Sequence, residues 1–71
     1  MSIGQNIKTV RKGKNMTQES FSELVGLSRS YLSDLENDRK NASIETIVKL
    51  SISSKVEISH FLHGLGYEVK K

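Results

Sequence analysis

The stretch Gln18–Asn37, QESFSELVGLSRSYLSDLEN, decides how this chain folds. Its apolar residues recur at intervals of three and four on either side of Gly26, which indicates two short amphipathic helices. Glycine suits the left-handed backbone that ends a helix, and Ser28, which follows closely, is a residue type that caps a new one. The apolar residues that would lock the two helices together are Phe21, Leu24, Val25, Leu27, Leu32 and Leu35.

This pair of helices is a helix-turn-helix arrangement, in which a small residue lies where the helices cross and the second helix presents an open outer face. Ser22 is small enough for the crossing, and Ser30, Ser33 and Asn37 form an outer face without bulky aliphatic side chains. Any helical hairpin with a glycine turn shares part of this pattern. The spacing by itself therefore leaves DNA binding and simple helical packing equally open.

Three further helices are expected around this pair. Helical spacing of Ile3, Ile7 and Val10, closed by Gly13, predicts a first helix over 3–13. The motif itself covers about 17–37, and Thr17 is the expected cap of its first helix. Ser43 is the expected cap of a fourth helix, whose apolar residues are Ile44, Ile47, Val48 and Leu50. The run Ser53, Ser54 and Lys55 ends that helix, and a short fifth helix containing Phe61 and Leu62 follows.

The predicted fold is therefore all-α and compact, with five helices in a single domain over 1–71. The tail 64–71 has two glycines and alternating apolar residues, which fit either a frayed coil or a short edge strand, and fraying is favoured. A chain of 71 residues buries a thin core, so a partner subunit is expected to add stability.

Composition excludes several functional classes. The chain has no Cys, so it has neither disulfides nor a thiolate site, and it shows no signal peptide and no apolar run long enough to span a membrane. A cytoplasmic location is expected. The net charge of +3 is compatible with a nucleic-acid partner. Charge is unevenly distributed. All charged side chains in residues 1–16 are basic, whereas those in residues 17–38 are acidic apart from Arg29.

Enzymatic chemistry finds little support in the sequence. His60 and His63 are three residues apart and could share a helix face, but no third metal ligand or acid–base partner lies near them. The chain has no glycine-rich phosphate loop and no nucleophile with a recognisable base. No enzyme activity, metal, cofactor or small-molecule effector is predicted.

The strings TQESFSELVGLSRSYLSDLEN and SIETIVKLS resemble the phage-repressor-like (Cro/Xre) helix-turn-helix family over about residues 3–63, with caps, turn glycine, core positions and loop in the same order. The resemblance implies a lambda-repressor-like fold and a transcriptional regulator that binds a palindromic double-stranded DNA operator as a homodimer. Among its members, the chain is similar to the small controller proteins of restriction-modification operons and to other stand-alone repressors. The alternative is an antitoxin or other protein-binding module, with contacts through the acidic 34–38 surface or the tail.

The resemblance also assigns roles to individual residues. Gln18 corresponds to a phosphate contact at the start of the second helix. The set expected to face the bases is Arg29, Ser30, Tyr31, Ser33, Asp34 and Asn37. Arg29 can donate two hydrogen bonds to guanine, and Tyr31 can contact a thymine methyl group or a phosphate, with core packing as its alternative. Asp34 is expected to point sideways and pair with Arg or Lys rather than accept from cytosine.

Loop and scaffold roles follow from the same resemblance. Asn37, Arg39 and Lys40 lie in the loop that holds the DNA backbone in this family, and Ser43 lies at a second helix start suited to a phosphate. Arg11 and Glu36 match an ion pair between the first and third helices. The chain departs from the family pattern at Ser20, which weakens the capping box, at Ser22, where Ala is usual, and at Ala42, where Pro is common.

A last apolar stripe predicts the subunit contact. Near the end of the chain, helical spacing places four apolar residues together: Ile58, Phe61, Leu62 and Leu65. The remaining domain is too small to cover them all, so part of this stripe is expected to form an isologous dimer contact.

Overall fold

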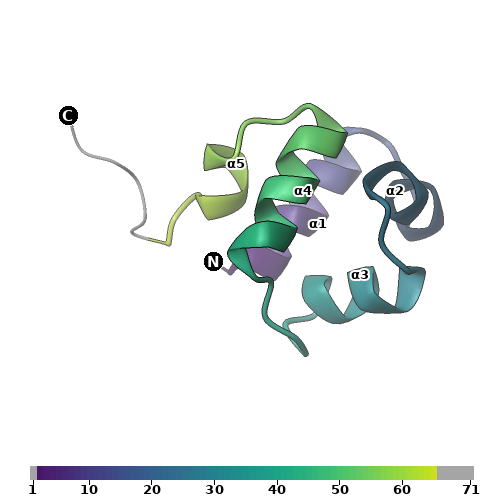
Figure 1. Ribbon diagram of the computed structural model, residues 1–71, viewed down its shortest axis with the longest axis horizontal. Coiled ribbons are helices and arrows are strands. Elements are labelled where there is room, and N and C mark those ends of the chain that lie inside the picture. Colours follow the sequence, from purple (N-terminus) through teal and green to yellow (C-terminus); the bar gives the residue numbers. More distant parts are fainter. Residues whose placement is uncertain (1, 66–71) are drawn as a thin grey trace.

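The computed structural model describes residues 2–65, which form five helices and no strand (Figure 1). The all-α, five-helix prediction is confirmed. The part of the predicted tail beyond residue 65 lies outside the described residues. The helices are α1 (Ile3–Gly13), α2 (Gln18–Val25), α3 (Arg29–Glu36), α4 (Ile44–Ser54) and α5 (Ser59–Leu62). None of them is long and apolar enough to cross a membrane.

Side-chain caps begin the four longer helices. The hydroxyls of Thr17, Ser28 and Ser43 each accept a hydrogen bond from the backbone N–H three residues later, as the sequence predicts. α1 begins with a full capping box, in which Ser2 and Gln5 satisfy each other's backbone N–H groups. These local bonds set where each helix begins.

The turn between α2 and α3 depends on Gly26. Its backbone lies in the left-handed region, with φ 71°, and ends α2 as predicted. The ammonium group of Lys49, on α4, donates to the Gly26 carbonyl oxygen at 3.1 Å. The turn is therefore tied to α4 as well as to its own helices.

The core lies between α1, α2, α3, α4 and α5 and consists of Ile7, Phe21, Val25, Leu32, Leu35, Ile47, Leu50 and Phe61. The expectation for Leu24 is wrong, because 44% of this residue is exposed. α2 packs mainly against α3 and α4, and this packing leaves Leu24 partly uncovered. On α4, Ile44 and Val48 also remain exposed although they belong to the predicted apolar pattern.

α1 and α3 cross unusually closely at Gly4. A Cβ atom at this position would overlap the carbonyl oxygen of Leu35 and lie 2.5 Å from a carboxylate oxygen of Asp38. At the same crossing, the Ser2 hydroxyl donates to the Asp38 carboxylate at 2.8 Å. This contact fixes the carboxyl end of α3 on α1.

Asn6 anchors α5 to α1. Its buried side-chain amide donates to the backbone oxygens of Phe61 and His63, at 2.9 Å each. Phe61 itself is fully buried, so the prediction that it forms a dimer contact is wrong. α5 has only four residues, and Phe61 is the one that its packing against α1 directs into the core.

Candidate nucleic-acid interface

The outer face of α3 and its surroundings form one continuous polar surface. Leu32 and Leu35 hold α3 on the core and thereby turn Ser30 and Asn37 outward, while Ser33 stays half-exposed. A shallow hollow of about 280 Å³ lies on this side, lined by Gln18, Arg29, Ser30, Ser33, Asp34 and Arg39. Residues from α2, from α3 and from the following loop thus meet at one place.

A buried ion pair supports this surface from behind. Arg11 Nε lies 2.7 Å from Glu36 Oε2, and Arg11 Nη2 lies 3.1 Å from Glu36 Oε1. Arg11 also donates to the carbonyl oxygen of Met16 at 2.9 Å. The side chains of Arg11 and Glu36 are only 11% and 1% exposed. Arg11 is therefore part of the scaffold that joins α1 to α3.

Gln18 belongs to the same network. Its side-chain Nε2 donates to Glu36 Oε1 at 3.1 Å, which fixes the amide at the start of α2. An amide nitrogen carries two N–H donors, so the second stays available for a ligand such as a phosphate oxygen. The sequence does not show this link, because Gln18 and Glu36 belong to different helices.

Asp34 lies at the centre of a second, exposed cluster. One of its carboxylate oxygens accepts from Arg39 Nε at 2.8 Å, and the other lies 3.8 Å from Lys40 Nζ. Asp34 is thus in the expected sideways arrangement. Lys40 Nζ lies 5.7 Å from the centre of the Tyr31 ring, which itself packs partly against the core. Tyr31 thus shows the core packing that was its alternative role and stays partly exposed.

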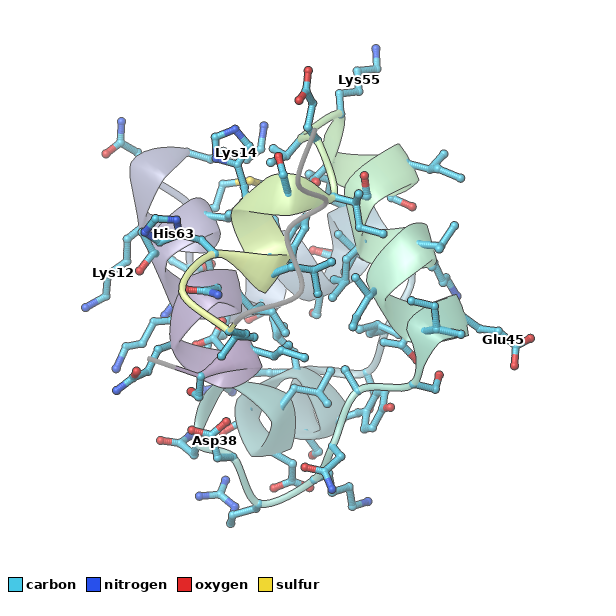
Figure 2. All side chains as sticks on the ribbon, turned by 90° about the vertical axis from the view of Figure 1, so that its left-hand side faces the viewer. Lys12, Lys14, Asp38, Glu45, Lys55 and His63 are labelled. Carbon is cyan, nitrogen blue, oxygen red and sulfur yellow. The ribbon has the colours of Figure 1, made fainter. Side chains whose placement is uncertain are left out.

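Asn37 and Ser43 make local hydrogen bonds. The Asn37 amide donates to the carbonyl oxygen of Ser33 at 2.8 Å. The Ser43 hydroxyl accepts from the backbone N–H of Thr46 and marks the exposed start of α4, from which Glu45 projects in Figure 2. Within the described residues, the side chain of Arg29 has no hydrogen bond or ion pair, so its guanidinium is free for a ligand. No group of three or more potential metal ligands is found in residues 2–65.

Residues 7–61 match the helix-turn-helix family. The chain is 41% identical over 59 residues to the immunity repressor of Bacillus phage phi105; this covers 83% of the chain but only 41% of that repressor. A solved structure of the restriction-modification controller protein C.AhdI from Aeromonas hydrophila superposes with a TM-score of 0.77 at 32% identity, covering 83% of this chain and 89% of that one.

The biofilm regulator SinR, solved in complex with DNA, superposes with a TM-score of 0.76 at 36% identity, covering 84% of this chain and 97% of that one. The family match spans most of the sequence and includes both helices of the motif and the loop after them. The chain therefore belongs to the Xre/Cro-like helix-turn-helix family of DNA-binding transcriptional regulators.

Proposed function

We propose that this protein controls transcription by binding a two-fold symmetric DNA operator as a homodimer, with α3 of each subunit in the major groove of one half-site. The observation that carries the proposal is the hollow on the outer face of α3, where side chains from three successive elements converge. Small residues at Ser30 and Ser33 leave room for the edges of base pairs. The relatives' names, an immunity repressor and a controller protein, support a regulatory role.

The residues on this side of the molecule fall into two groups, one that would contact bases and one that would contact the DNA backbone. Arg29 lies at the amino-terminal end of α3, the end that enters the groove in this motif, and its free planar fork matches the two acceptors of guanine. Gln18 and Ser43 lie at the amino-terminal ends of α2 and α4, where unpaired backbone N–H groups favour phosphates. Lys40 adds a cation on the loop, 60% exposed at its side chain.

Subunit contact is best provided by the exposed face of α4. Ile44, Val48 and Ile52 recur every four residues and are 64%, 40% and 72% exposed. Since the amino terminus of α4 would face DNA, a two-fold axis that brings both α3 helices to one duplex also brings both α4 amino termini to that side. Two α4 helices would then pack in parallel along the two-fold axis, with the same apolar face of each subunit in an isologous contact.

The end of the chain offers a weaker alternative for this contact. Ile58, Leu62 and Leu65 remain after Phe61 is removed from the predicted set, but all three are half-buried. Ile58 and Leu62 also pack against the core of their own subunit. They therefore present less apolar area to a partner than the α4 face does.

The acidic 34–38 segment gives little support to a role as a protein-binding module. Asp34 is paired with Arg39 and Lys40, Glu36 is buried against Arg11, and Asp38 accepts a hydrogen bond from Ser2. The acidic groups of this segment are thus all engaged within the chain.

Selection of bound duplexes from random-sequence DNA tests the proposed function. We expect a palindromic consensus, and an affinity whose logarithm falls linearly with the logarithm of salt concentration. Recovery of no consensus, or of a single asymmetric half-site at all protein concentrations, would contradict the proposal of a dimer on a symmetric operator.

A further inference from the structure

Arg39 belongs to the loop after α3, yet its side chain folds back onto the helix. Its Nε donates to Asp34 Oδ1 at 2.8 Å, and its Nη2 donates to the Ser33 hydroxyl at 3.3 Å. The backbone N–H of Arg39 also donates to the Asp34 carbonyl oxygen at 2.8 Å. Main chain and side chain are thus both fixed to the last turns of α3.

The direction of this side chain matters for function. Arg39 lines the same hollow as Arg29, Ser30 and Ser33, which are the residues expected to face the bases. A guanidinium has five N–H donors, and the bonds to Asp34 and Ser33 use one edge of it. The tip, formed by the remaining N–H groups of Nη1 and Nη2, stays unpaired within the described residues.

We propose that Arg39 reads a guanine through O6 and N7 in the major groove, and that Asp34 is the positioning residue that holds its fork in place. This inference rests on the proposed function. The family resemblance places Arg39 in the loop that holds the DNA backbone and gives it no contact with a base. A fixed planar fork fits the two coplanar acceptors of guanine, and this pairing is the commonest specific contact in the groove.

The charge of Asp34 favours a base over a phosphate as the partner of Arg39. A carboxylate beside the guanidinium offsets much of its positive charge, which weakens a purely electrostatic contact with a phosphate. A base contact depends instead on the orientation of the guanidinium, and the hydrogen bond to Asp34 fixes that orientation. The Lys40 ammonium group lies farther from Asp34, at 3.8 Å, so its charge is offset less and it is the better cation for a phosphate.

The test compares four variants on two kinds of duplex: the consensus selected by the wild-type protein, with each G·C pair also replaced in turn, and random-sequence DNA. Arg39→Ala should weaken binding to the consensus by about 5- to 150-fold per half-site and leave random DNA nearly unchanged. Arg39→Lys should lose the same preference, because an ammonium group has no planar fork. Lys40→Ala is the matched control and should weaken both duplexes alike.

The Asp34→Asn variant tests whether Asp34 positions the Arg39 side chain. It should reduce discrimination at the same G·C pair that Arg39→Ala affects, while binding to random DNA increases because a negative charge is lost. A uniform loss for Arg39→Ala on both duplexes, or an Asp34→Asn variant with full discrimination at that pair, would overturn the inference and leave the proposed function standing. Failure of the wild-type protein to prefer any duplex would overturn both.

Discussion

Arg11 on α1 and Glu36 at the end of α3 form a two-point ion pair that is almost fully buried, with N···O distances of 2.7 and 3.1 Å. Both groups find further partners in Met16 and Gln18, and no buried side-chain polar atom among the described residues lacks a hydrogen bond. The pair joins α1 to α3 on the side of α3 that faces the protein interior.

Removal of one partner from this pair should therefore destabilise the fold. Arg11→Ala leaves the Glu36 carboxylate buried without its cation, and we expect a loss of about 3–5 kcal/mol in the free energy of unfolding. Denaturant unfolding followed by circular dichroism measures it. Arg29→Ala, at an exposed arginine, is the control and should change stability by less than about 0.5 kcal/mol. Unchanged stability with lost DNA binding would instead make Arg11 a phosphate contact.

Two glycines on the same helix should respond to alanine in opposite directions. Gly4→Ala places a Cβ atom on the Leu35 carbonyl, which must move, and should cost about 1–3 kcal/mol. Gly13→Ala meets no atom within 4 Å and should be neutral or stabilising by up to about 1 kcal/mol, because alanine favours helix. Thermal melting of the two variants distinguishes them. Equal melting temperatures would show that α1 and α3 do not cross as closely as described.

Asn6 should control the attachment of α5. Asn6→Ala leaves the backbone oxygens of Phe61 and His63 without their donor, so we expect a loss of about 1–3 kcal/mol. Hydrogen exchange should show the loss of protection concentrated at α5. Thr9→Ala removes an exposed hydroxyl bond on the same helix and serves as control. Uniform loss of protection across the domain would mean that α5 does not open separately from the rest.

Arg29 should contribute to the sequence specificity of DNA binding. Its guanidinium is free at the amino-terminal end of α3, so Arg29→Ala should cost about 1–3 kcal/mol on the selected operator and little on random DNA. Lys40→Ala should weaken both and lower the salt slope by about one unit for each lost phosphate contact. Fluorescence anisotropy titrations at several salt concentrations measure both effects. If Arg29→Ala weakens both duplexes equally, specificity must come from other residues on this face.

The α4 face should carry the dimer contact. Ile52→Glu places a charge at a site that is 72% exposed in the single subunit, so the fold should persist while association is lost. Sedimentation velocity at matched concentrations should show a monomer for this variant and a dimer for the wild type. Leu24→Glu, at an exposed apolar residue on α2, is the control and should leave association unchanged. A wild-type protein that stays monomeric at high micromolar concentration, free and on DNA, would rule out this surface.

The sequence alone determined where the helices begin and where the chain turns between α2 and α3, because both depend on contacts between residues close in sequence. Thr17, Ser28 and Ser43 cap helices through bonds that span three residues, and Gly26 supplies a backbone conformation that its own lack of a side chain permits. The ion pair of Arg11 and Glu36 could be predicted only from the family resemblance, since no rule of spacing links residues so far apart in sequence.

Only the tertiary structure decided which apolar residues are buried. Helical periodicity marks a face but not what covers it, so Leu24 proved exposed and Phe61 proved part of the core. Hydrogen bonds between distant segments, such as those of Asn6 to the end of α5, depend on how the helices cross. The placement of Arg39 over α3 depends on the path of the loop after Asn37, which the left-handed backbone of Asp38 turns back toward the helix.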